Sequence, residues 1–289
     1  MYKFLKLVIA SALFACLSTV AHAQKAGVGA WENPDFTMLG WIEETPALGW
    51  YYNWRPDQIY SKTSHRRTVE FVPMIHSAKD INKRIRSNVT VRNLLAFNEP
   101  DGHGNMSVGQ AIKLWPKLER RGLRLSSPAT KRGNTLGKNS WQYQFMKEAE
   151  ARGLRVDFMA VHYYSTNGSI PEFRNWLRAV HAAYKRPIWV TEFALIDWHR
   201  PSRTTHQQNA KFATDAIRMM ESLPFVERHA WFAANPYKWN GQTPRLNLVN
   251  NDLTLTATGR AFDRVLGQIG SRHVSANDRT PLGPRALRN

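Results

Sequence analysis

The chain has 289 residues, a formal net charge of +18 at pH 7 and a single cysteine. This length allows a large buried core without covalent staples, and one cysteine excludes a disulfide framework within the chain. The charge favours anionic surroundings such as nucleic acid, phospholipid or acidic polysaccharide. However, the basic residues are scattered and match no nucleic-acid motif. The two remaining interpretations are a solvated basic surface and a dedicated anion site.

Residues 1–23 have the pattern of a secretory signal peptide. Two lysines begin it, an apolar stretch covers residues 7–20, and Ala21-His22-Ala23 supplies small side chains at a cleavage site. The apolar stretch is short for a transmembrane span. We therefore expect a secreted or periplasmic mature chain. The competing interpretation is a lipoprotein cleavage site at Cys16.

Strand-like segments recur along the remaining chain, with helical patterns between most of them. Eight such segments are predicted, at 26–31, 48–54, 69–76, 93–98, 123–128, 156–164, 187–194 and 228–233. Eight strands that alternate with helices would close into a (β/α)8 TIM barrel. The sequence thus predicts an α/β fold with one barrel domain over residues 24–270.

Cap residues and glycine stops indicate where the helices lie. Helices are predicted over 111–121, 141–152 and 258–268, with two more that begin after Ser169 and Thr205. The first two connections, 32–47 and 55–68, lack helical periodicity, so their helices are expected to be reduced or absent. Residues 271–289 are rich in Arg, Pro and Asn, which predicts a flexible basic tail.

Two of the predicted strands end in an isolated glutamate. Glu99 follows an apolar run and precedes Pro100, which stops the strand, and Glu192 ends a second β-rich run. Because parallel strands of a barrel end at one mouth, we expect the two carboxyl groups to face each other. Glycosidic bond cleavage needs such a pair, one group to protonate the leaving oxygen and one to attack or activate water. The alternative for either glutamate is a solvated loop position.

The ordered set of motifs is similar to glycoside hydrolase family 128, a clan A family of β-1,3-glucan-active enzymes. The resemblance rests on Phe97-Asn98-Glu99-Pro100-Asp101 with Leu114-Trp115-Pro116, on Trp50-Tyr51-Tyr52-Asn53-Trp54, and on Trp189-Val190-Thr191-Glu192-Phe193-Ala194. It runs from about Ala26 to Leu266. It implies a retaining double displacement, with Glu99 as general acid/base and Glu192 as nucleophile.

Three polar residues near the glutamates are further candidates. Asn98 is predicted to bond the hydroxyl next to the reacting carbon, and its alternative role is turn formation. His162 and Tyr164 share one face of the sixth strand, because side chains alternate along a strand. The resemblance implies that Tyr164 donates to the nucleophile. His162 could orient a carboxylate or bind sugar, and a buried structural histidine is the alternative.

Sugar rings present flat C–H faces that pack on aromatic rings. Among the 11 tryptophans, several fall at predicted strand ends or mouth loops, so we expect sugar platforms at Trp54, Trp198, Trp231 and Trp239, with Tyr237 nearby. The resemblance assigns to Trp231 the platform beneath the sugar being cleaved. Core packing is the alternative for these rings. His76 stands where the family often has an aromatic residue, which exchanges a stacking surface for a hydrogen-bonding group.

No metal-binding spacing, phosphate-cradling loop or serine nucleophile motif is present. With the two glutamates, Asn98 and the aromatic mouth, the resemblance implies a secreted, endo-acting β-1,3-glucanase, and we expect it to need no metal or organic cofactor, to bind no nucleic acid and to work as a monomer. One alternative is a binding protein that holds β-1,3-glucan oligosaccharides without hydrolysis. Another, motivated by the charge, is a hydrolase of an anionic exopolysaccharide or attachment to an anionic cell surface.

Overall fold

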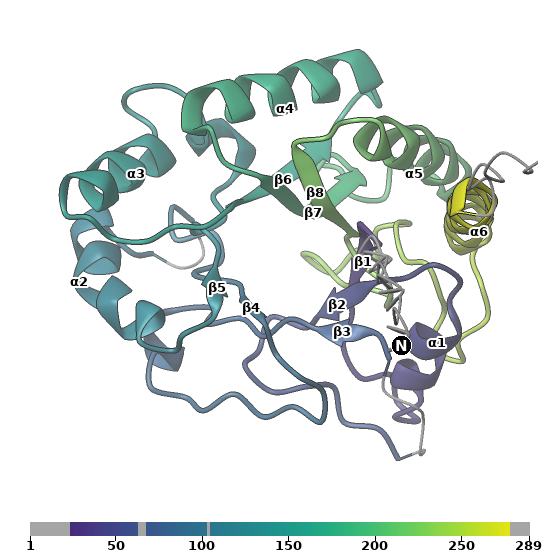
Figure 1. The fold of residues 1–289 in the computed structure, drawn as a ribbon. Coiled ribbons are helices and arrows are strands. Elements are labelled where there is room, and N and C mark those ends of the chain that lie inside the picture. The colour runs from purple at the N-terminus through teal and green to yellow at the C-terminus, as the bar shows by residue number, and fades with distance from the viewer. Residues whose placement is uncertain (1–23, 63–67, 103–104, 278–289) are drawn as a thin grey trace, which may run out of the picture.

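The computed structural model describes residues 24–62, 68–102 and 105–277. Within these ranges, parallel strands form a ring with helices outside it (Figure 1). The strands are β1 (Ala26–Gly29), β2 (Trp50–Tyr52), β3 (Glu70–Phe71), β4 (Asn93–Leu94), β5 (Arg124–Leu125), β6 (Met159–Ser165), β7 (Ile188–Leu195) and β8 (Val226–Trp231). The predicted signal peptide lies outside the described residues.

Strand pairing closes the ring. Six strands pair in the order β3-β2-β1-β8-β7-β6, and β4 pairs with β5. Isolated parallel bridges join these two sheets, from Met74 to Leu95 on one side and from Ser126 to Phe158 on the other. All eight predicted segments contain a strand, so the predicted α/β class with a TIM-barrel-like fold is confirmed.

Large side chains fill the interior of the ring. This inner cluster consists of Trp50, Tyr52, Val72, Met74, Leu95, Phe158, Trp189 and Ala230. Bulky residues at inward positions leave a packed core rather than a pore. Space is tight enough that a Cβ added at Gly27 would lie 2.4 Å from the Trp50 ring. The functional side chains must therefore sit above this packed interior.

Ion pairs close the N-terminal end of the ring. Glu70 accepts a hydrogen bond of 2.7 Å from Arg228, whose guanidinium lies 4.3 Å from the centre of the Trp189 ring. Arg124 makes two bonds, of 2.8 and 2.6 Å, to the carboxylate of Glu227. Paired charges satisfy each other at this half-buried end, and they leave the opposite end for the candidate site.

The helices follow the predicted caps. They are α1 (Met38–Glu44), α2 (Val108–Glu119), α3 (Trp141–Ala151), α4 (Ile170–Tyr184), α5 (His206–Glu221) and α6 (Ala257–Asn277), with 3-10 turns η1 (Ala78–Asp80) and η2 (Arg132–Asn134). The hydroxyls of Ser107, Ser169 and Thr205 accept bonds from the first turns of α2, α4 and α5. The connection between β1 and β2 holds only the short α1, and the described residues between β2 and β3 form no helix. Both observations agree with the prediction that the first two helices are reduced or absent.

The last helix differs from its prediction. α6 was expected to end at Gln268 but continues to Asn277, so residues 271–277 of the predicted tail are helical. No proline follows before Pro281, the helix continues through Gly270, and Val265, Leu266 and Ile269 pack against the core. The rest of the predicted tail, 278–289, lies outside the described residues. Among the described helices, none combines the length and apolar character needed to cross a membrane.

Candidate active site

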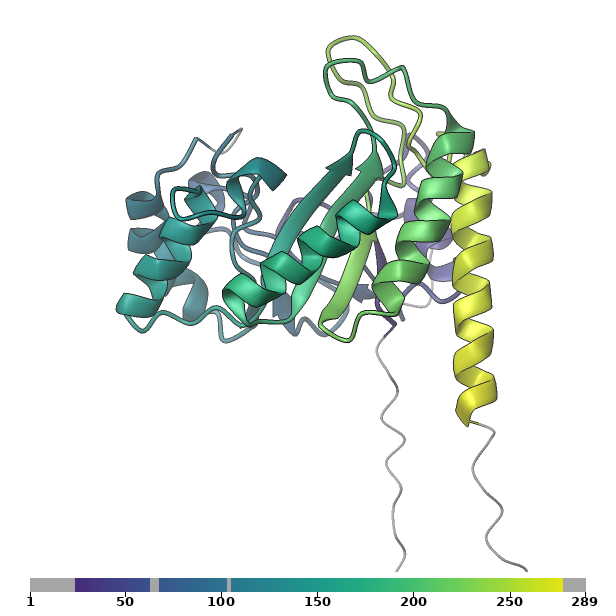
Figure 2. The same cartoon turned by 90° about the horizontal axis from the view of Figure 1, so that it is seen from above.

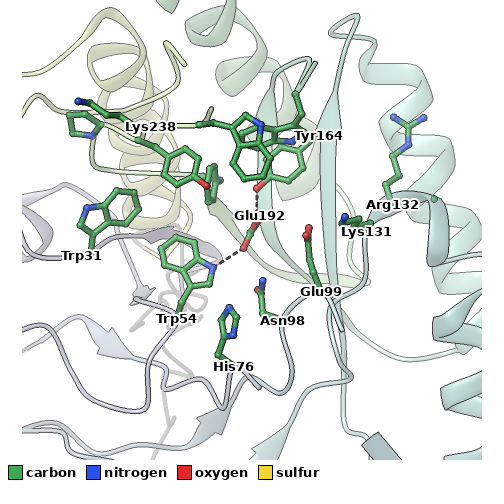
Figure 3. A pocket seen from close by; sticks show the side chains of 16 residues that line it. Trp31, Trp54, His76, Asn98, Glu99, Lys131, Arg132, Tyr164, Glu192 and Lys238 are labelled. Carbon is green, nitrogen blue, oxygen red and sulfur yellow. Dashed lines mark hydrogen bonds between the residues drawn. The ribbon is translucent and has the colours of Figure 1, made fainter. Parts of the chain in front are cut away.

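A pocket of about 970 Å³ lies at the C-terminal end of the barrel strands. Figure 3 shows Glu99 and Glu192 near its centre, with aromatic rings on one side and basic side chains at the periphery. Its lining includes nearly all the residues predicted for the site: Trp54, His76, Asn98, Glu99, Tyr164, Glu192, Trp198, Tyr237 and Trp239. The structure therefore brings together side chains that are far apart in the sequence.

A β-bulge turns Glu192 into the barrel mouth. Trp189 points into the barrel, so strict alternation would send Thr191 inward and Glu192 outward. However, Val161 pairs with Val190 and His162 pairs with Glu192, which leaves Thr191 as an extra residue in β7. A bulge of one residue reverses the side-chain alternation beyond it. Glu192 is consequently 4% exposed and faces His162 and Glu99.

Hydrogen-bond donors surround the Glu192 carboxyl group. The indole nitrogen of Trp54 donates to Oε1 over 2.8 Å, and the hydroxyl of Tyr164 donates to Oε2 (Figure 3). The hydroxyl of Tyr52 donates to the Thr191 carbonyl and lies 3.4 Å from Glu192 Oε1. Donors of this kind bind the ionised form of a carboxyl group. The Tyr164 contact has the geometry predicted for it.

His162 lies between the two glutamates. Its Nδ1 is 3.0 Å from Glu99 Oε1, and its Nε2 is 3.5 Å from Glu192 Oε1. One ligand-type atom from each of these three residues lies within 4.8 Å of the others. The histidine is fully buried and contacts both carboxyl groups, which fits the predicted carboxylate-orienting role better than a sugar contact. Two carboxylates and an imidazole are also the donor types of a divalent metal site.

Charge coupling governs this cluster. Burial raises the pKa of Glu192, and the neighbouring Glu99 raises it further, whereas His162, Tyr164 and Trp54 act in the opposite direction. Burial alone would lower the pKa of His162, but the charges of Glu192 and Glu99 outweigh it and raise that pKa overall. Burial and the charge of Glu192 raise the pKa of Tyr164 well above its usual value. Tyr164 therefore stays protonated and remains a donor.

Glu99 and Asn98 occupy a tight turn after β4. Glu99 has a φ of +38°, an uncommon conformation for a residue with a side chain, and its backbone N–H bonds the Ala129 carbonyl over 2.7 Å. Strained backbone of this sort is frequent at functional sites. The side-chain Oδ1 of Asn98 is buried and has no partner among the described residues. A substrate hydroxyl would satisfy it.

Two long loops carry the aromatic side of the pocket. Figure 2 shows the segments that follow β7 and β8 standing out together from the barrel beside α5 and α6. Trp198 on the first loop lies 5.3 Å from Trp239 and 6.2 Å from Tyr237 on the second, measured between ring centres. A bond of 2.9 Å from Ser202 to Gln242 also joins the loops. The rings therefore form one connected surface.

Trp231 was predicted as a sugar platform, and that prediction is wrong. Its ring is fully buried, packs 5.0 Å from Phe193, and donates to the Leu246 carbonyl over 2.8 Å. Alternation along β8 directs Trp231 outward, toward the helices. The next residue, Phe232, lines the pocket instead. Its ring lies 5.6 Å from that of Trp54.

Sequence reasoning missed several residues that line the pocket or lie directly beneath it, as Tyr52 does. Tyr52 precedes Trp54 by two positions, and the shared strand face was a signal that could have identified it. Trp31 belonged to the first predicted strand, 26–31, and no role in the site was predicted for it. In the structure it follows β1 and lines the pocket. Lys131, Arg132 and Lys238 line the pocket as well. Their proximity depends on how loops fold, so no local pattern indicated it.

A TIM-like barrel with two carboxyl groups facing each other at its C-terminal mouth, beside an aromatic surface, is the architecture of a barrel glycoside hydrolase. The profile of the glycosyl hydrolase catalytic core matches residues 29–262. The chain belongs to this family and, by its similarity to solved structures, to glycoside hydrolase family 128.

Two solved structures and one curated protein illustrate the similarity. An endo-β-1,3-glucanase of family 128 from Amycolatopsis mediterranei, in complex with laminarihexaose, is 33% identical with a TM-score of 0.72 over 83% of this chain and 99% of that one. A second, from Sorangium cellulosum, is 25% identical with a TM-score of 0.67 over 83% and 98%. Alkali-sensitive linkage protein 1 of Schizosaccharomyces pombe is 27% identical over 250 residues, and the chain covers only 43% of its length.

Proposed function

We propose that this protein is a retaining β-1,3-glucanase with Glu99 as general acid/base and Glu192 as nucleophile. The observation that carries the proposal is the distance between the carboxyl groups, which present oxygens within 4.8 Å of each other. Retaining enzymes separate these groups by about 5 to 5.5 Å, whereas inverting enzymes need about 6.5 to 9.5 Å to admit a water. The short distance supports direct attack on the sugar.

In the first step, Glu192 attacks the anomeric carbon while Glu99 protonates the oxygen of the departing chain. The glycosyl–enzyme bond forms as the glycosidic bond breaks. In the second step, Glu99 removes a proton from a water molecule that attacks the same carbon, and Glu192 leaves as a carboxylate. Trp54 and Tyr164 donate to the Glu192 oxygens and would stabilise the carboxylate before attack and after release.

The substrate assignment draws on both the site and the relatives. The connected rings of Trp198, Tyr237 and Trp239 offer flat apolar surfaces for pyranose rings. The Amycolatopsis relative carries the name endo-β-1,3-glucanase and was solved with a laminari-oligosaccharide. These observations support endo-acting cleavage of β-1,3-glucan. His76 lines the pocket and supplies a hydrogen-bonding group at one subsite.

The test compares wild-type protein with Glu192→Gln on β-1,3-, β-1,4- and β-1,6-glucans. We expect reducing ends to appear with the β-1,3-glucan alone, as a ladder of intermediate sizes, and with the β-anomer formed first. Glu192→Gln should lose turnover but keep oligosaccharide binding. Glu148→Gln, an exposed glutamate on α3, is the matched control and should keep full activity. Binding without hydrolysis by the wild type would instead favour the oligosaccharide-binding alternative.

Export is the second part of the proposal. It rests on the sequence pattern of residues 1–23. Mass spectrometry of the protein recovered from cells that export it should find a mature N-terminus at Gln24. An N-terminus at Cys16 carrying a lipid would contradict cleavage by the ordinary signal peptidase and favour membrane anchoring.

A further inference from the structure

Three basic side chains lie around the candidate active site. Lys131 and Arg132 follow β5 and line the pocket on the Glu99 side, whereas Lys238 belongs to the aromatic loop after β8, between Tyr237 and Trp239 (Figure 3). They come from two loops separated by more than a hundred residues in the sequence. The only carboxyl groups among the residues that line the pocket are Glu99 and Glu192. Away from the reacting centre, the lining is therefore positive.

None of these three cations has a carboxylate partner among the described residues. No ion pair involves Lys131, Arg132 or Lys238, although twelve other pairs occur in this part of the chain. The carboxylate of Asp101 bonds the backbone N–H of Lys131 and the side-chain amide of Asn134 instead. The three positive charges are thus available to a ligand.

Two of the cations contact neighbouring residues, although their side chains are exposed. The guanidinium of Arg132 lies 4.6 Å from the centre of the Tyr163 ring, within the range of a cation–π contact. The Lys131 side chain packs on Gly102, where an added Cβ would meet its terminal carbon at 2.4 Å. A contact that restricts a side chain reduces the conformational entropy that it loses when it binds a ligand. This arrangement is more than a general excess of surface lysines.

We propose that the natural substrate is a β-1,3-glucan that carries anionic substituents, bound through Lys131 and Arg132 on one side of the cleavage point and through Lys238 on the other. This inference rests on the proposed function of the same site. A neutral glucan would leave these cations without partners. Carboxylate or phosphate groups on the sugar chain would pair with them, and the net charge of +18 would raise the rate of encounter with such a polymer.

The experiment measures kcat/KM on three polymers of matched length: unmodified, carboxymethylated and phosphorylated β-1,3-glucan. At low salt, the wild type should prefer one or both charged polymers. The double variant Lys131→Gln/Arg132→Gln should lower the ratio of charged to neutral kcat/KM by about three- to ten-fold, the range expected for two exposed ionic contacts. Comparison of the two charged polymers identifies which anionic group is recognised.

Lys113→Gln/Lys147→Gln is the matched control. It removes two exposed lysines from α2 and α3, outside the pocket, and so changes the net charge by the same amount. Its selectivity ratio should equal that of the wild type. Raising the ionic strength to about 0.5 M should reduce the preference of the wild type, because the Debye length falls well below 8 Å. Equal losses of selectivity in both double variants, or no preference at low salt, would overturn the proposal.

Binding by Glu192→Gln separates this inference from the proposed function. Affinity electrophoresis in gels that contain neutral or charged glucan measures retention without turnover. Retention by the charged polymer that exceeds retention by the neutral one, and that depends on Lys131 and Arg132, supports the inference even if the wild type hydrolyses nothing. Equal retention by the two polymers contradicts it even if the wild type is an active glucanase.

Discussion

The indole nitrogen of Trp54 donates a 2.8 Å hydrogen bond to Oε1 of Glu192. This contact joins a residue that follows β2 to the proposed nucleophile on β7. Trp54 itself has a φ of +57°, so its backbone adopts an uncommon conformation to place the ring there. The tryptophan therefore stabilises the ionised form of the Glu192 carboxyl group and also forms part of the aromatic surface of the pocket.

Replacement of Trp54 by Phe should move the acid limb of the pH–activity profile to higher pH. The indole donor stabilises the ionised form, so its loss raises the pKa of Glu192 further. We also expect kcat to fall by about ten-fold, which corresponds to one hydrogen bond to a charged group. Trp141→Phe is the control, because it removes an indole bond of 2.8 Å to the Met106 carbonyl outside the pocket. An unchanged acid limb in Trp54→Phe would contradict the role.

Gly29→Ala should displace the Trp54 ring. A Cβ at this position would lie 2.5 Å from the ring and 3.2 Å from the Tyr52 hydroxyl, both next to Glu192. We expect a lower melting temperature together with the pH shift of the Trp54 variant. The control is Gly109→Ala in α2, where an added Cβ meets nothing within 4 Å. That change should stabilise the helix by about 0.5–1 kcal/mol. Unaltered activity in Gly29→Ala would show that the ring can shift freely.

Replacement of Glu99 by Ala should slow cleavage in a manner that depends on the leaving group. General acid catalysis contributes about 10²–10⁴-fold, and a good leaving group needs little protonation. The loss in kcat/KM should thus be largest for the natural polymer and smallest for aryl glycosides with acidic phenols. A series of aryl laminaribiosides measures this dependence. The same loss on every substrate would argue against an acid role.

Glu70→Ala should destabilise the fold without affecting the chemistry. Glu70 accepts bonds of 2.7 Å from both Arg228 and Asn93, and its removal leaves a largely buried guanidinium unpaired. We expect a loss of about 3 kcal/mol in the free energy of unfolding. Glu148→Ala breaks an exposed pair with Arg152 and should cost less than about 0.5 kcal/mol. Urea unfolding measures both values, and similar small losses would contradict the structural role.

Removal of divalent metals should leave activity unchanged. Glu99, His162 and Glu192 are donor types that could hold an ion. However, Trp54 and Tyr164 already donate to the oxygens of Glu192, and His162 contacts Glu99. Dialysis against EDTA followed by assay in metal-free buffer tests this prediction. Loss of activity that a single divalent ion restores would show a metal requirement.

Local sequence patterns were sufficient for the eight strands, for the starts of several helices and for the proposed catalytic pair. Alternating and apolar runs marked all eight strands, and hydroxyl caps marked the starts of α2, α4 and α5. Both glutamates stood out because each is an isolated charge in an apolar run, although β7 continues past Glu192 to Leu195 and β4 ends at Leu94, before Glu99. Residues that are neighbours in the chain determine strand runs and helix caps, so these elements can be predicted from the sequence without a structure.

Side-chain direction at the pocket depended on contacts between distant strands. The bulge at Thr191 turns Glu192 inward, and the alternation on β8 sends Trp231 outward and Phe232 into the pocket. Neither outcome follows from one strand alone, because register is set by the neighbouring strands of the closed barrel. The position of Lys131 beside Glu99 is of the same kind. Sequence alone thus determined where the strands lie and which isolated glutamates accompany them, and the closed barrel decided which side chains meet at its mouth.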